Sequence, residues 1–228
     1  MEPHQEPQTT PQEPQTTPQE PQTTPQEPQT PQEEPPTPKI EELCIAGAAN
    51  RGIAYIGALK CLNDNDMLDL KKFVGVSIGS LVGVLCIVGI DMDELIEEVL
   101  KQDTSEFQDI SFYAVFSKGS ILNGEKYRLW VWDVLSRKID PMTNFETMYE
   151  TFNVDIIIGA VSLDSGNDGL EFFSKDNHPK MPIFYAIIAS MAIPFIFPPV
   201  VYSGKRYVDG GVLDNFPFNL LSKHAIGI

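Results

Sequence analysis

Residues 73–90 read Phe-Val-Gly-Val-Ser-Ile-Gly-Ser-Leu-Val-Gly-Val-Leu-Cys-Ile-Val-Gly-Ile and contain no charged side chain. A short apolar run, Phe73–Val76, passes through a turn into residues that suit a buried helix. Gly-x-Ser-x-Gly between a strand and a helix is the nucleophile-elbow pattern. The turn is so tight that side chains at Gly75 and Gly79 would collide with it. It holds the Ser77 hydroxyl at a helix N-terminus, where the dipole favours negative charge.

Two other interpretations of this segment compete with the elbow. A glycine-rich apolar run produces Gly-x-Ser-x-Gly by chance, and 18 uncharged residues reach the minimum length of a membrane helix. Four glycines and two serines make the segment a poor span, and Asp91 and Asp93 follow directly. Four prolines also exclude a continuous membrane helix in the second uncharged stretch, Met181–Ser203.

The N-terminal residues have a different composition. Residues 1–38 repeat Glu-Pro-Gln-Thr-Thr-Pro-Gln with a seven-residue period and hold 12 of the 19 prolines. They offer too little apolar surface to offset the entropy of ordering them. We therefore predict a disordered, proline-rich repeat arm over residues 1–40 and one folded domain over residues 41–228. The arm is either a plain spacer or a Pro-x-x-Pro ligand for a protein partner, and it lacks the features of a signal peptide.

The charge and the cysteines limit the classes of partner. The net charge is −16, so nucleic-acid binding, which depends on neutralising phosphates, is not expected. Anionic membranes are disfavoured for the same reason, so any transient membrane contact should be apolar and local. Cys44, Cys61 and Cys86 lie in apolar stretches without metal-ligand spacing, which indicates buried thiols in a reducing compartment. We expect a cytoplasmic protein, at times peripheral to membranes, without metal or other cofactor.

A second strand-to-helix turn lies near the start of the folded region. Glu42–Ala46 is typical of a buried strand and Ile53–Leu62 of a helix. The loop between them consists of Gly47, Ala48, Ala49, Asn50, Arg51 and Gly52. Such a loop points backbone N–H groups at an anion, either a phosphate or the oxyanion of acyl transfer. A tight turn without a ligand fits this segment equally well, and Arg51 either orients a phosphate head group or pairs with an acidic neighbour.

A carboxylate follows a later predicted strand. Asp209-Gly210-Gly211 ends Arg206–Val208, and an acid in that position is free to face the serine of a neighbouring strand. Val154–Leu163 is typical of a central parallel strand. We also expect a polar connection over Asn63–Lys72, a helix capped by Asn123 and running to about Lys138, a helix from Asn144, and a helix starting over Phe218–Lys223. The segment Gln102–Leu122 is irregular and aromatic, and it either packs as a loop or covers the site.

The motifs Gly47–Gly52, Gly75–Gly79 and Asp209–Gly211, with Ala189–Val200 between them, resemble in order and spacing the patatin-like phospholipase family. The resemblance covers residues 43–228 and extends to Asn215 and Pro217. It implies an α/β fold, a three-layer sandwich with a central mostly parallel sheet. It also implies hydrolysis of acyl esters in phospholipids or other lipids without histidine or metal. Ser77 would be the nucleophile, Asp209 the general base, and the amides of Gly47–Gly52 the oxyanion hole.

The chain departs from the family pattern in two places. Ala48 and Ala49 stand where the family usually has glycines. Alanine keeps its N–H but disfavours positive φ, so this loop can form an oxyanion hole only if both residues have negative φ. The chain also ends at Ile228, sooner after Gly211 than relatives generally do, so we expect a domain shortened at its C-terminus.

The implied mechanism has one weak point and one rival, and the implied function also has one rival. Aspartate has a pKa near 3.9 and is a poor base at neutral pH, so we expect burial beside residues 194–200 to raise the pKa of Asp209. The rival mechanism is a Ser-Asp-His triad that uses His178 or His224. The rival function is a catalytically silent binding protein of the same fold that uses the proline-rich arm for partners.

Overall fold

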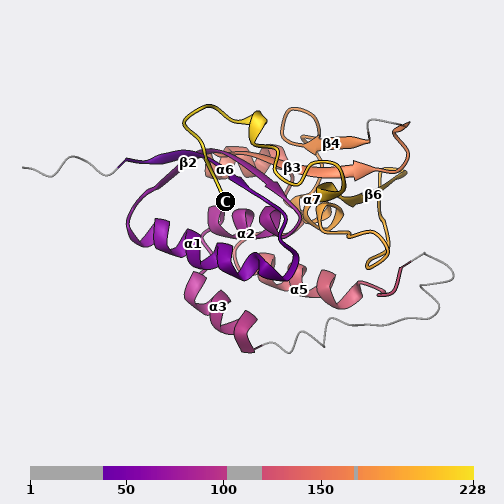
Figure 1. Ribbon diagram of the computed structural model, residues 1–228, viewed down its shortest axis with the longest axis horizontal. Helices are drawn as coiled ribbons and strands as arrows, with labels where there is room; N and C mark the ends of the chain where they lie inside the picture. Colours follow the sequence, from indigo (N-terminus) through magenta and orange to yellow (C-terminus); the bar gives the residue numbers. More distant parts are fainter. Residues whose placement is uncertain (1–37, 102–119, 167–168) are drawn as a thin grey trace, which may run out of the picture. The chain divides into compact units, whose positions relative to one another are not determined.

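The computed structural model describes residues 38–101, 120–166 and 169–228 (Figure 1). The predicted arm therefore lies almost wholly outside the described residues, as does most of the aromatic segment Gln102–Leu122. In the described ranges, no helix is both long enough and apolar enough to cross a membrane.

The described residues form strands, α-helices and short 3₁₀ turns. The strands are β1 (Ile40–Ile45), β2 (Leu68–Val76), β3 (Asp155–Ser162), β4 (Leu170–Phe173), β5 (Val200–Tyr202), β6 (Lys205–Asp209) and β7 (Ile226–Gly227). The α-helices are α1 (Ile53–Asp64), α2 (Ile78–Ile87), α3 (Met92–Lys101), α5 (Glu125–Ser136), α6 (Phe145–Phe152) and α7 (Ile183–Ser190). Short 3₁₀ turns are η1 (Ala49–Gly52), η4 (Gly210–Val212) and η5 (Phe218–Leu220).

One sheet organises these elements. Its strand order is β5-β6-β3-β2-β1-β7, and β4 also pairs with β3. Strands β1, β2, β3 and β7 are parallel, whereas β4 and β6 run antiparallel to β3. Helices α2 and α7 pack directly on the sheet, α1 packs on α2, and α3 and α5 lie farther out (Figure 1). The predicted α/β class, a central mostly parallel sheet flanked by helices, is confirmed.

The edges of β3 explain how the two predicted site strands meet. Strand β4 pairs with residues 158–161 along one edge of β3. Strands β2 and β6 must therefore share the other edge end to end. Val76 at the end of β2 pairs with Gly159, and Asp209 at the end of β6 pairs with the next residue, Ala160. The register thus brings the chain that leaves β2 next to the chain that leaves β6.

The apolar run of the elbow segment forms the centre of the core. Phe73, Val74 and Val76 are fully buried, and the Phe73 ring fills the space between β2 and α2. A Cβ built on Gly75 would lie 2.6 Å from Phe73 Cζ, and one on Gly83 would lie 2.0 Å from it. Glycines on both elements therefore let the strand and the helix approach closely enough to enclose one phenylalanine ring.

One predicted element is wrong, and a predicted helix is present with a different start. The polar connection Asn63–Lys72 is in part strand, because β2 already begins at Leu68. Leu68 and Lys72 pair with β1, and Lys72 also pairs with β3, so backbone pairing with β1 outweighs the polar composition. The predicted helix capped by Asn123 begins one residue later, at Glu125, because Gly124 takes the N-cap position with φ 78°.

The C-terminal residues are also different from the prediction. Phe218–Lys223 forms only the short turn η5, after which Ile226–Gly227 pairs in parallel with β1. The Ala46 N–H donates to the Ile228 carbonyl, and the Ile228 N–H donates to the Cys44 carbonyl. The open edge of β1 thus pairs with Ile226–Gly227, which follow the segment predicted to start a helix.

Candidate active site

Ser77 stands at the turn between β2 and α2. Its backbone has φ 53° and ψ −133°, a strained conformation for a residue with a side chain. A Cβ on Gly79 would lie 2.4 Å from the Ala46 carbonyl oxygen and 2.5 Å from that of Ile45. One on Gly75 would lie 2.6 Å from the Ser80 Cα. Both glycines of the motif are therefore required by backbone atoms that cannot move aside easily.

The structure places Ser77 and Asp209 in direct contact. Ser77 Oγ donates a hydrogen bond of 2.6 Å to Asp209 Oδ2, and each residue is only 5 % exposed. The Gly211 N–H donates to the other carboxylate oxygen at 2.8 Å. Burial raises the pKa of Asp209, and the hydrogen bonds from Ser77 and Gly211 offset only part of this effect. The carboxylate is therefore a stronger base than a solvated aspartate.

Ser190 and Ala192 support the two site residues, and sequence reasoning gave them no role. The Ser77 N–H donates to Ser190 Oγ at 2.8 Å, and this hydroxyl donates to the Gly159 carbonyl at 2.6 Å. The Asp209 N–H donates to the Ala192 carbonyl at 2.9 Å. The sequence offered one signal, a polar residue at the end of an otherwise apolar helix. The structure buries Ser190 fully.

The predicted oxyanion loop keeps only some of its amides available. The Gly47 N–H donates to the Asn215 carbonyl at 3.3 Å, and the Arg51 N–H donates to the Ala48 carbonyl at 3.0 Å. Within the described part of the chain, the N–H groups of Ala48 and Ala49 have no hydrogen-bond partner. The candidate donors to an oxyanion are therefore the N–H groups of Ala48 and Ala49, at the start of η1. Gly52 has a packing role instead, since a Cβ there would lie 2.4 Å from the Ile78 side chain.

The condition of negative φ at both alanines is met by Ala48 but not by Ala49, whose N–H nevertheless has no hydrogen-bond partner within the described residues. Ala48 has φ −142°, but Ala49 has φ 47°. A left-handed conformation costs an alanine about 1–2 kcal/mol. The loop is held in this shape by Asn215, whose Nδ2 donates to the Gly47 carbonyl at 2.9 Å. Asn215 therefore binds both backbone groups of Gly47, a role that no local sequence pattern indicated.

These residues surround a cleft of about 370 Å³. It is lined by Gly47, Ala48, Ala49, Ser77, Ile193, Pro194, Asp209, Gly211, Val212 and Asn215. Its polar side chains are those of Ser77, Asp209 and Asn215, and its apolar side chains include those of Ile193, Pro194 and Val212. A Cβ on Gly47 would lie 3.0 Å from the Ser77 Cβ, so the loop lies directly against the serine. This arrangement suits a carbonyl group attached to an apolar chain.

Comparison with known proteins shows the family of this chain. The family model for patatin-like phospholipases matches residues 43–222. The chain belongs to this family. The match covers more than three quarters of the sequence and includes the segments that contain Ser77 and Asp209.

Individual relatives are more distant. The chain is 28 % identical to the uncharacterized protein R571 of Acanthamoeba polyphaga mimivirus, over 80 % of this chain and 61 % of that protein. It is 26 % identical to the probable lipid hydrolase 463L of Invertebrate iridescent virus 6, over 80 % of this chain and 63 % of that protein. It is 28 % identical to lysophospholipase NTE1 of Candida albicans, over 81 % of this chain and 12 % of that protein. The chain thus spans less than two thirds of each of these relatives.

A solved structure shows the same fold. VipD from Legionella pneumophila superposes with a TM-score of 0.59 at 15 % identity, over 83 % of this chain and 49 % of that one. At this identity the likeness concerns the fold alone.

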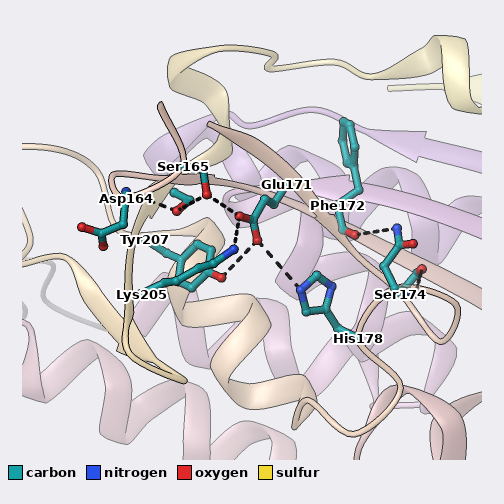
Figure 2. A network of polar contacts seen from close by, with 10 residues as sticks. Asp164, Ser165, Glu171, Phe172, Ser174, His178, Lys205 and Tyr207 are labelled. Carbon is teal, nitrogen blue, oxygen red and sulfur yellow. Dashed lines mark hydrogen bonds and ion pairs between the residues drawn. The ribbon is translucent and has the colours of Figure 1, made fainter. Parts of the chain in front are cut away.

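The histidines of this patatin-like domain lie outside the cleft. His178 points towards Glu171, with 3.9 Å between Nε2 and Oε2 (Figure 2). Glu171 also accepts hydrogen bonds from Ser165, Lys205 and Tyr207. Burial lowers the pKa of His178, so this histidine tends to stay neutral. His224 is exposed near the C-terminus.

Other candidate groups in the patatin-like domain have simpler roles. Among residues 38–101, 120–166 and 169–228, no three His, Cys, Asp or Glu side chains come together as metal ligands. Burial raises the pKa of Cys44 to about 12 and that of Cys86 to about 11, so neither is a ready nucleophile. Cys61 is exposed, which corrects the expectation that all three thiols are buried.

Proposed function

We propose that this chain is a lipid acyl hydrolase that cleaves acyl esters with Ser77 as nucleophile and Asp209 as general base. One observation carries the proposal: a serine on a strained strand-to-helix turn donates a 2.6 Å hydrogen bond to a buried carboxylate. A serine hydroxyl needs an adjacent base to attack a carbonyl. Within the described residues, Asp209 accepts the hydrogen bond that the Ser77 hydroxyl donates, which supports its role as the base.

In the first step, Ser77 Oγ forms a bond to the ester carbonyl carbon while its proton moves to Asp209 Oδ2. The carbonyl oxygen becomes an oxyanion, which we assign to the free N–H groups of Ala48 and Ala49. Loss of one oxyanion donor typically costs about 10²–10³ in rate. The tetrahedral intermediate then expels the alcohol, which takes the proton back from Asp209, and leaves an acyl group on Ser77.

In the second step, water attacks the acyl group and gives a proton to Asp209. Collapse of this intermediate releases the fatty acid and returns the proton to Ser77. The raised pKa of Asp209 supports both steps, because a general base is most effective when its pKa lies nearer the working pH.

For the substrate, we propose lipids that carry a phosphate next to the acyl ester. Relatives of this chain carry the names lysophospholipase and probable lipid hydrolase. Arg51 adjoins the proposed oxyanion amides, is exposed, and forms no ion pair within the described residues. An unpaired arginine at this position suits a phosphate. Replacing Arg51 with glutamine should raise KM for lysophosphatidylcholine but not for a monoacylglycerol of the same acyl chain.

Labelling with a fluorophosphonate tests the proposal. We expect the probe to attach to Ser77 of the intact protein. Ser77→Ala and Asp209→Asn should abolish labelling and lipid hydrolysis without lowering the thermal midpoint. Ser136→Ala, at an exposed serine on α5, is the matched control and should behave as wild type.

Three results would contradict the proposal. Labelling of a residue other than Ser77 would remove its nucleophile. Loss of activity in folded His178→Ala or His224→Ala protein would favour a triad. A well-folded protein without labelling at any pH from 5 to 9 would favour the silent binding function.

A further inference from the structure

The segment that follows the cleft-lining Pro194 has an unusual backbone. Phe195 has φ 67° and its side chain is 78 % exposed. A bulky residue in the left-handed region is a genuine outlier, and one that gains no burial from it lacks a packing reason. Such strain persists only where surrounding structure imposes it, and it concentrates at functional sites.

Backbone hydrogen bonds impose this conformation. The N–H groups of Ile196 and Phe197 both donate to the Ile193 carbonyl, which closes the turn. The Ile121 N–H donates to the Phe195 carbonyl at 2.8 Å, and the Leu122 N–H donates to the Ile196 carbonyl at 2.9 Å. As a result, Phe195 and Phe197, two positions apart, have different surroundings. Phe197 packs on Tyr127 with ring centroids 4.5 Å apart, whereas Phe195 faces solvent.

Phe195 belongs to a group of exposed apolar side chains at the mouth of the cleft, which we call the apolar rim. The rim consists of Phe195, Ile196, Val212 and Leu213, which are 78 %, 40 %, 52 % and 53 % exposed. Val212 lines the Ser77 cleft, Leu213 is its neighbour, and Phe195 follows the cleft-lining Pro194. The rim therefore continues the apolar wall of the cleft out to the surface.

The charges around the rim select the kind of surface that it fits. Residues 181–203 contain no charged side chain, and neither do residues 210–213. The whole chain carries a net charge of −16, which repels anionic lipid head groups. An uncharged apolar rim on an acidic protein matches a neutral, zwitterionic lipid surface, into which aromatic and aliphatic side chains insert.

We propose that the apolar rim docks this protein on neutral phospholipid surfaces and aligns the Ser77 cleft with the acyl esters of the outer leaflet. This proposal rests on the proposed function, because docking serves the hydrolysis of acyl esters. Docking is nevertheless measured separately from hydrolysis. The strained turn at Phe195 exposes an aromatic side chain beside the cleft. Val212, at the end of η4, and the following Leu213 expose aliphatic side chains.

The experiment measures binding and two kinds of hydrolysis. Binding is flotation of the Ser77→Ala protein with phosphatidylcholine vesicles. Hydrolysis is measured with the Ser77 protein on the same vesicles and on a water-soluble short-chain ester. We expect Phe195→Asn and Leu213→Ser each to weaken flotation and vesicle hydrolysis about tenfold or more, the effect of one buried side chain. Hydrolysis of the soluble ester should be unchanged.

Two features of the design keep the test informative. Asparagine tolerates the left-handed conformation, so Phe195→Asn should keep or raise the thermal midpoint, whereas a core residue would lose stability. Leu129→Ser, at a 69 % exposed leucine of α5, is the matched control for Leu213→Ser and should alter none of the readouts. Vesicles with added phosphatidylserine should bind more weakly at low salt.

The outcomes separate the two proposals. Flotation without hydrolysis of either substrate by the Ser77 protein would refute the proposed function and leave the docking surface standing. Normal flotation of the rim variants would overturn the docking surface, as would loss of the soluble-ester activity to the same degree. A shift from dimer to monomer in light scattering, with flotation unaltered, would assign the rim to contact between copies of the chain.

Discussion

The elbow Gly75–Gly79 and the loop Gly47–Gly52 are both strand-to-helix turns, and they end the adjacent parallel strands β2 and β1. Each contains one non-glycine residue at positive φ: Ser77 at 53° and Ala49 at 47°. In the elbow, both glycines are fixed by backbone atoms that a Cβ would strike. The loop tolerates alanine where the family usually has glycine and depends on Asn215, from a distant segment, for its shape. The elbow is thus determined locally, and the loop is determined by tertiary contact.

The largest expected effect is that of a methyl group in the elbow. Gly79→Ala places a Cβ within 2.5 Å of two carbonyl oxygens at the end of β1, and the backbone cannot yield without opening the sheet. We expect a loss of about 3 kcal/mol or more in the free energy of unfolding, measured by urea denaturation, together with loss of fluorophosphonate labelling.

Gly57→Ala is the control for this prediction. Gly57 lies within α1, and a Cβ there meets nothing within 4 Å. This substitution should stabilise the protein by about 1 kcal/mol, the helix-propensity difference between the two residues. Equal destabilisation by both substitutions would show that the elbow is no more constrained than an ordinary helix position.

The second effect concerns the clamp on the loop. Asn215→Ala removes the hydrogen bond from Nδ2 to the Gly47 carbonyl and should let the Ala48 and Ala49 amides drift. We expect kcat to fall about 10²–10³-fold, as for loss of an oxyanion donor, with KM and the thermal midpoint little changed. The exposed Asn219→Ala, four residues later, is the control. A rise in KM at constant kcat would assign Asn215 to substrate binding instead of loop positioning.

The same contrast explains how much the sequence could predict. The spacing of Gly75, Ser77 and Gly79 predicted a turn that depends on its own residues, and the structure contains that turn. The clamp by Asn215 and the positive φ of Ala49 depend on partners far along the chain, which no local pattern reports. The start of β2 at Leu68 was missed for the same reason, because pairing with Ile40 of β1 makes a polar segment part of a strand.

A third prediction separates the chemistry of the elbow from its stability. The pKa of Asp209 is raised in the folded protein, so the native state binds more protons than the unfolded chain between the ordinary aspartate pKa and the raised one. The free energy of unfolding should therefore fall as pH rises through this interval. Over the same interval, kcat/KM should rise as Asp209 loses its proton and becomes a base.

Thermal midpoints between pH 3 and 7 check the sign. Asp209→Asn should gain stability relative to wild type as pH rises. Asp164→Asn should do the opposite, because hydrogen bonds from Arg206 lower the pKa of Asp164. Parallel stability profiles for wild type and Asp209→Asn would contradict burial as the cause of the raised pKa.

The smallest effect compares two neighbouring alanines of the loop. Ala49→Gly relieves a left-handed conformation that costs alanine about 1–2 kcal/mol, and glycine gives back about 0.5–1 kcal/mol through the entropy of the unfolded chain. The net result should be a gain of about 0.5–1 kcal/mol in urea unfolding. Ala48 has φ −142°, so Ala48→Gly relieves nothing and should lose about 0.5–1 kcal/mol. The two variants differ by one position and add the same residue, so opposite signs can arise only from the backbone. If both variants lose stability, the Ala49 conformation carries no strain, and the hydrogen bonds of Asn215 do not hold the loop in an unfavourable shape.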